Sequence, residues 1–161
     1  MPVSTSLVEI ARTLAAGRVL GVVHVNGHRG PLRVRHATPA DGTPLLLTRS
    51  TGTLAAALVP PPGACDTAVV LSVDGHRPDL PGRLWLSGWA EPLGGARARA
   101  AALEYAEVNP TEDLLGVGRG HALYRVEVGE VRLAFGSSLV ELDVDEFRAA
   151  SPLALDHLMT G

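Results

Sequence analysis

Short strand-like segments separated by tight turns constrain the fold of this chain more than any other feature of its sequence. The segment 19–25 is apolar with β-branched residues, and an Asn-Gly pair at 26–27, a strong hairpin signal, follows it. In 32–36, apolar side chains alternate with Arg33 and Arg35, so one strand face should be apolar and the other cationic. Consecutive strands joined by short turns pair antiparallel, so the pattern predicts a mostly antiparallel sheet.

Helices are expected before, between and after these strands. Ser6 and Glu9 have capping-box spacing, in which each side chain bonds the other's backbone N–H, at the start of a predicted helix at 6–16. The same spacing recurs at the start of a predicted C-terminal helix at 143–159, and the barrel strands should occupy about 19–142. Further strands are predicted at 44–48, 67–73, 83–91, 123–128, 131–135 and 139–142, with a turn at 129–130 and helices at 51–58 and 96–108.

The order of these elements predicts one α+β domain, residues 1–161, built on a β-barrel flanked by helices. Closure of the sheet into a barrel is favoured because it removes exposed strand edges. The length of 161 residues fits one domain with one core. Apolar residues make up 46% of the chain and aromatic residues 4%, so that core should consist mostly of Val, Leu and Ala side chains.

The charged residues and the single cysteine argue against several functions. The chain has a formal net charge of −3 and no Lys, so it lacks the basic face that nucleic-acid binding needs. Cys65 has no partner for an internal disulfide or a CxxC zinc motif, which favours a reducing compartment. No signal-peptide pattern and no 18-residue apolar window is visible, so we predict a cytoplasmic protein that does not enter a membrane.

Four stretches of the sequence carry a resemblance to a known family. They are 30–73, which contains RVRHATPADGTPLLLTRSTGTLAA, RLWLSGWAEPL at 83–93, EYAEVNPTEDLL at 104–115 and ALYRVEVGEVRLAFG at 122–136. In order and spacing they resemble the pyridoxamine 5'-phosphate oxidase-like FMN-binding split barrels. Within that superfamily they are nearest the haem-utilisation, haem oxygenase-like branch and related bacterial proteins of unknown function. The resemblance implies a mostly antiparallel split β-barrel flanked by helices, and a homodimer that binds its cofactor at the subunit interface.

The resemblance also implies which residues hold a cofactor. In FMN-binding members, an Arg on the second strand, a Thr ending the third strand, and a Ser and a Lys at the following helix bind the phosphate, where free N–H groups and a cation favour a dianion. Arg33 matches the strand Arg, with Arg35 as the near alternative, and Thr48 matches the Thr. Gly52 falls at the Ser position, and Arg49 is the candidate to replace the absent Lys. The implied cofactor-binding set is Arg33, Arg35, Thr48, Arg49, Ser50, Thr51 and Thr53.

These residues also have ordinary structural interpretations. Arg33 and Arg35 can form a solvated strand face, and the Ser and Thr residues within 48–53 can cap the helix that follows. Trp85 and Trp89 share one strand face, where they can stack on a flat ligand, pack in the core or line a dimer interface. For the tryptophans we favour the core or the interface.

Three functions fit the sequence, and none of them assigns a catalytic side chain. The first is a flavin-type oxidoreductase, in which FMN or a deazaflavin does the redox chemistry and the protein positions it. The second is a haem-binding or haem-degrading protein, with His157 or His121 as the iron ligand. His24, His36 and His121 show no HxH or HxxxH spacing among themselves, so no preformed zinc site is predicted from them. The third is a cofactor-free homodimer that serves as an accessory or binding module for a small anion.

Overall fold

The computed structural model describes residues 6–75, 78 and 80–153, and the first of its elements is the predicted N-terminal helix. Helix α1 (Leu7–Ala15) starts at Ser6, whose hydroxyl accepts from the Glu9 N–H while the Glu9 carboxylate accepts from the Ser6 N–H. Both bonds of the capping box are therefore present. Gly17 follows with φ 97°, a left-handed conformation that glycine adopts without strain and that ends the helix. Within the described residues, no helix is both long and apolar enough to span a membrane.

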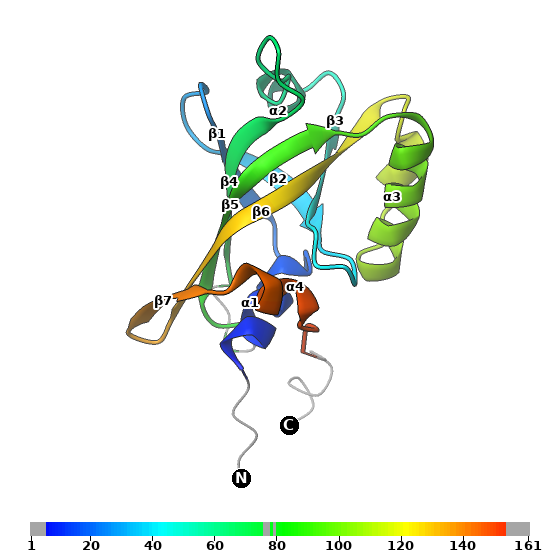
Figure 1. Cartoon of the computed structure of the whole chain (residues 1–161). Helices are drawn as coiled ribbons and strands as arrows, with labels where there is room; N and C mark the ends of the chain where they lie inside the picture. The colour runs from blue at the N-terminus through cyan, green and yellow to red at the C-terminus, as the bar shows by residue number, and fades with distance from the viewer. Residues whose placement is uncertain (1–5, 76–77, 79, 154–161) are drawn as a thin grey trace.

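Six antiparallel strands form a closed barrel, and a seventh strand extends it (Figure 1). The sheet order is β3-β2-β1-β4-β5-β6-β7, and an additional pairing of β3 with β6 closes the ring. The structure thus confirms the predicted α+β class and the antiparallel split barrel. The strands are β1 (Gly21–Val25), β2 (Leu32–Ala37), β3 (Leu45–Arg49), β4 (Thr67–Asp74), β5 (Arg83–Pro92), β6 (His121–Phe135) and β7 (Ser138–Leu142).

Strand β3 closes the barrel and is covered on both faces. Leu45, Leu46 and Leu47 are all buried. Leu46 belongs to the cluster inside the barrel, whereas Leu45 and Leu47 pack outside it with Tyr105 of α3 (Gly95–Val108). A continuous apolar run suits such a strand because neither face meets water.

Strand β6 is one continuous strand, so the two strands predicted on either side of a turn at 129–130 were wrong. The ladder pairs Ser87 with Glu130 but Gly88 with Val128, which leaves Gly129 without a partner on β5. This is a β-bulge, in which one extra residue bends the strand without ending it. The bulge shifts the apolar alternation by one residue, and the sequence pattern therefore resembled a turn.

The helices cover both ends of the barrel and one side of it (Figure 1). Helices α1 and α4 (Val144–Ala149) lie together at one end, α2 (Thr53–Ala57) lies at the other, and α3 lies along the outside. The predicted C-terminal helix is wrong over 150–153, because Ala150 is extended and Pro152 disfavours a helical conformation at the residue before it. The rest of that prediction, 154–159, lies outside the described residues.

A buried arginine fastens α4 to α1. Arg12 is 2% exposed, and its guanidinium donates to the backbone carbonyls of Phe147 at 3.2 Å, Arg148 at 2.9 Å and Pro39 at 3.0 Å, and also to that of Ala150. The guanidinium lies 5.6 Å from the centre of the Phe147 ring. The last carbonyls of a helix have no partner within it, so Arg12 supplies the missing donors at the end of α4.

Replacing this arginine should destabilise the fold. Arg12→Met keeps the aliphatic stem but leaves buried carbonyls without donors, so we expect a loss of about 3 kcal/mol and a fall in Tm of roughly 6–12 °C. Arg132→Met is the matched control because Arg132 is exposed and pairs with the nearby Glu130; its effect should stay within about 0.5 kcal/mol. Equal urea midpoints for the two variants would contradict a capping role for Arg12.

A buried histidine makes the stability depend on pH. His36 is 1% exposed, and its Nε2 donates to the Val19 carbonyl at 2.9 Å. Its Nδ1 has no partner among the described atoms. Burial lowers the pKa of His36, and the backbone around its ring, chiefly the hydrogen-bonded Val19 carbonyl, opposes this effect. The folded protein therefore binds a proton at this ring less readily than the unfolded chain does.

Acid should accordingly weaken the fold through His36. Above the unfolded pKa of about 6.5, His36 does not make the stability depend on pH. Below that pH the unfolded chain binds the proton more readily, so the free energy of unfolding falls by up to about 1.4 kcal/mol per pH unit. We expect the free energy of unfolding of the native protein to fall more steeply between pH 7 and pH 5 than that of His36→Gln, which has no titratable group. Parallel pH curves from chemical denaturation would be evidence against this role for His36.

Candidate functional site

Three arginines of the predicted set face the outside of the barrel, where β2 and β3 run side by side. Arg35 is the ladder partner of Leu47, which packs outside the barrel against α3. Side chains alternate along a strand, so Arg33 and Arg49, each two residues further along, face the same side. Both are exposed. The outer face of β2 and β3 therefore carries three guanidinium groups, which we call the arginine face.

A carboxylate that the sequence did not predict lies on this arginine face. Asp113, on the 3₁₀ helix η1 (Glu112–Gly116), forms a short ion pair with Arg35. The other nitrogen of the Arg35 fork donates to Thr111 Oγ1 at 3.2 Å. The hydrogen bond from Arg35 lowers the pKa of Asp113, and the charges of His121 and Arg49 lower it further. Asp113 is thus the carboxylate around which Arg35, Arg49 and His121 are grouped.

A buried tyrosine lies beneath this group. Tyr105 of α3 is fully buried, and burial raises the pKa of its hydroxyl to about 12, while the charge of Arg35 opposes the increase. The Tyr105 hydroxyl has no hydrogen-bond partner among the described atoms. The side chains beneath the arginine face are therefore apolar, except for the Tyr105 hydroxyl, which makes no hydrogen bond to the described residues.

The serine and threonine residues of the predicted set are divided between places. Thr48 faces the opposite side of β3 from Leu47 and Arg49, because β3 pairs with β6 without a break. Ser50 and Thr51 lie in the exposed turn after β3, and Thr53 is the exposed first residue of α2. Helix α2 starts at Gly52 with no side-chain cap, so the alternative interpretation of these residues as helix caps was wrong. The hydroxyls of Ser50, Thr51 and Thr53 thus do not cap α2, and Thr48 faces away from the arginine face.

Of the two candidate haem ligands, His121 lies beside the arginine face and His157 lies outside the described residues. His121 opens β6 as the ladder partner of Arg49, and its Nε2 is 3.7 Å from Asp113. Its Nδ1 faces Gly116, where a side-chain carbon would come within 2.8 Å. Both ring nitrogens therefore face the protein. Among the described residues, no group of three or more His, Cys, Asp or Glu side chains could hold a metal ion.

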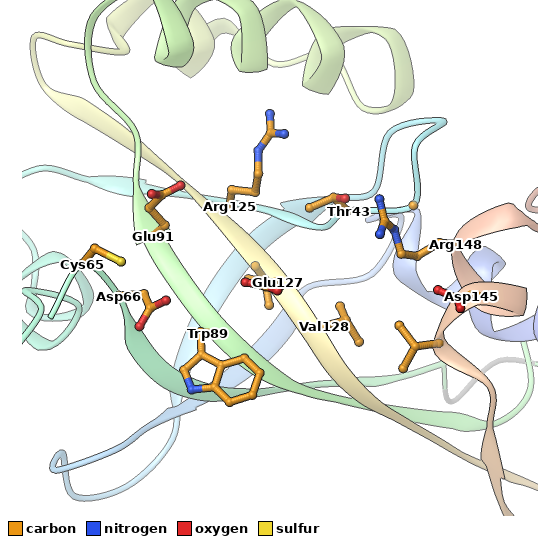
Figure 2. A pocket seen from close by; sticks show the side chains of 13 residues that line it. Thr43, Cys65, Asp66, Trp89, Glu91, Arg125, Glu127, Val128, Asp145 and Arg148 are labelled. Atoms are coloured by element: carbon orange, nitrogen blue, oxygen red, sulfur yellow. The ribbon is translucent and has the colours of Figure 1, made fainter.

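A cavity of about 510 Å³ lies elsewhere on the barrel, along β6 and the start of α4 (Figure 2). Asp66, Glu91, Glu127 and Asp145 contribute carboxylates to its lining. Arg125 points toward α3 (Figure 2). One nitrogen of its guanidinium group lies 4.0 Å from the carboxylate of Glu104. Neither Arg35 nor Arg49 lines this cavity. The surplus of carboxylates makes it a poor site for a phosphate.

The two tryptophans lie on the outer face of β5, so of the two favoured positions the core is wrong and the dimer interface stays a prediction. Trp89 is 46% exposed and Trp85 is half-buried, while Leu84 and Leu86, on the opposite face of β5, are buried in the barrel core. The Arg83 guanidinium lies 5.0 Å from the Trp85 ring. An exposed tryptophan on an uncovered sheet face is compatible with both an interface and ligand stacking.

Comparison with known proteins identifies the barrel but not an activity. No protein-family model matches the chain, and no curated protein matches it in sequence. A heme binding protein from Mycobacterium smegmatis matches over 91% of this chain and 62% of its own, with a TM-score of 0.69 and 19% identity. Campylobacter jejuni ChuZ matches over 77% of this chain and 54% of its own, with a TM-score of 0.60 and 10% identity.

A third structure brings in the oxidase family. It is a protein from Clostridium acetobutylicum related to general stress protein 26 of B. subtilis and described as pyridoxinephosphate oxidase family. It matches over 80% of this chain and 87% of its own, with a TM-score of 0.51 and 13% identity. The chain spans less than two thirds of the Mycobacterium and Campylobacter chains. At these identities the shared property is the fold, and the split-barrel resemblance seen in the sequence is confirmed at that level.

Arginine side chains that bind a ligand should be dispensable for folding. The Arg35–Asp113 pair is exposed by 37% and 40%, and such pairs contribute little to stability. We therefore expect Arg35→Gln and Arg49→Gln each to change the free energy of unfolding by less than about 0.5 kcal/mol in urea titrations. A loss as large as that of Arg12→Met would mean that the arginine face is structural.

Proposed function

We propose that this chain, which has the split-barrel fold of the pyridoxamine 5'-phosphate oxidase-like superfamily, binds the phosphate of a flavin cofactor on its arginine face. FMN is the first candidate, and a deazaflavin is the alternative within the same class. The observation that carries this proposal is the placement of Arg33, Arg35 and Arg49 on one outer face, where Asp113 pairs with Arg35. In this proposal the bound flavin supplies the redox chemistry of an oxidoreductase, and the protein binds and orients it.

Charge and geometry both favour a phosphate at this face. Guanidinium groups bind phosphate oxygens in pairs of parallel hydrogen bonds, so three of them offer more donors than one phosphate can use. The chain as a whole is acidic, with a net charge of −3, yet this face is cationic. The Lys position of the family falls at Thr53 or Leu54, in α2, and Arg49 at the end of β3 is the candidate to supply the missing positive charge. The donor set therefore fits an anionic group even though Gly52 replaces the serine and Thr48 turns away.

A homodimer would complete this site. Arg33 and Arg49 of the arginine face are exposed, and the exposed Leu20, Trp89 and Leu139 leave apolar side chains uncovered on the barrel. A second copy would bury such side chains and enclose a ligand, as the family resemblance implies. We place the protein in the cytoplasm, where an exposed thiol such as Cys65 stays reduced.

Haem binding is the second candidate function. It is supported by His121 near the arginine face, where guanidinium groups could pair with haem carboxylates, and by the fold shared with a heme binding protein. Iron coordination by His121 would require its ring to turn away from Asp113 and Gly116. This rearrangement makes haem the weaker candidate. A cofactor-free dimer that binds a small anion is the remaining alternative.

Absorption spectra of the purified protein, alone and after addition of FMN and then haemin, separate these functions. We expect a flavin band near 450 nm that stays with the protein through gel filtration and that Arg49→Gln weakens by about tenfold in affinity, since one charge-assisted contact is lost. Arg132→Met serves as the control because Arg132 lies on a different part of the barrel. A Soret shift without a retained flavin would favour haem, and no retained band would favour the cofactor-free module.

A further inference from the structure

We infer that Asp113 is an internal competitor for anions, holding Arg35 until a phosphate-bearing ligand displaces it. This inference deepens the proposed function and rests on it for the identity of the flavin, though not for the binding of phosphate itself. Asp113 pairs with Arg35 of the arginine face, and it occupies the guanidinium fork that an incoming phosphate would need.

Asp113 and a phosphate would compete for the same guanidinium group of Arg35. Arg35 binds Asp113 through one nitrogen of its fork and Thr111 through another, so two of its donors are already used. The charges of His121 and Arg49 also stabilise the ionised Asp113. A phosphate that reached Arg35 and Arg49 would meet a like charge at hydrogen-bond range, which is strongly unfavourable. Phosphate and Asp113 therefore exclude one another at Arg35.

The segment that carries Asp113 is lightly packed, and its Leu114 is only partly buried against the cluster outside the barrel. Helix η1 is a single stretch of five residues with no side-chain cap and no buried residue. Leu115 within it is 87% exposed. Proline at 110 precedes it, and a glycine-rich loop at 116–120 follows it, with Gly118 in the left-handed region at φ 89°. Because the ion pair itself is exposed, breaking it costs little compared with what a doubly charged phosphate gains from two arginines.

This arrangement selects a ligand by charge. A neutral flavin without a phosphate cannot displace the carboxylate, whereas a phosphate monoester can. The hydroxyl of Tyr105 is buried, so the displacing group would be held by the guanidinium groups alone. Removing the charge of Asp113 should therefore tighten phosphate binding.

The test measures the dissociation constant of inorganic phosphate by ³¹P NMR titration and that of FMN by fluorescence quenching. The variants are Asp113→Asn, which keeps the side-chain size, and Glu112→Gln, which removes the neighbouring exposed carboxylate of η1 as the control. We expect Asp113→Asn to bind phosphate about tenfold more tightly than the native chain, and Glu112→Gln to differ by less than about twofold. Adding Arg35→Gln to Asp113→Asn should abolish the gain.

The two ligands separate the inference from the proposed function. Phosphate binding that is absent, equal or weaker in Asp113→Asn, in protein with a native circular dichroism spectrum, would overturn the inference. A gain with phosphate but no binding of FMN by any variant would support the inference and overturn the flavin proposal. Equal affinity of the native chain and Asp113→Asn for FMN would leave the flavin proposal standing and overturn the role of Asp113.

Discussion

The pairing of β3 with β6 is the contact on which the rest of this structure depends. It turns an open sheet into a barrel and leaves β3 with no edge exposed to solvent. Closure turns Leu46 into the barrel core, while α3 covers Leu45 and Leu47 on the outer face, so the three consecutive leucines are all buried. The same pairing brings Arg49 opposite His121 and holds the loop before β6, with Asp113, against the outside of β2. The arginine face is thus a direct result of barrel closure.

Stability and binding are separated along the barrel. At one end, α1 and α4 pack together through the buried Arg12 and the fully buried Phe147 (Figure 1). Near the other end, Arg49 leads into α2, and the charged side chains are exposed. Exposed ion pairs contribute little to folding, so the arginine face can change in charge without loss of the barrel. This separation makes the arginine face suitable for a ligand.

Much of the barrel could be predicted because strand alternation and turn residues are local signals. The capping box at Ser6 and the hairpin positions needed no tertiary information. The bulge at Gly129 could not be predicted, because a one-residue slip in alternation looks the same as a turn until the partner strand is known. The end of α4 was missed although Pro152 signalled it.

Of the candidate site, only the arginines could be predicted from the sequence. Arg33, Arg35 and Arg49 follow from strand periodicity and from the resemblance, since both depend on position in the sequence. Asp113 lies 78 residues from Arg35 along the chain, and only the closed barrel brings them together. A carboxylate at such a separation gives no local signal, and the TED segment before the glycine loop is an ordinary turn sequence.

A crystal structure of the protein grown with FMN tests the central claim most directly. The account predicts the flavin phosphate bound between Arg35 and Arg49, with the Asp113 carboxylate moved away from Arg35. A flavin phosphate bound elsewhere, for example in the cavity beside Glu127, with the Arg35–Asp113 pair intact, would contradict it.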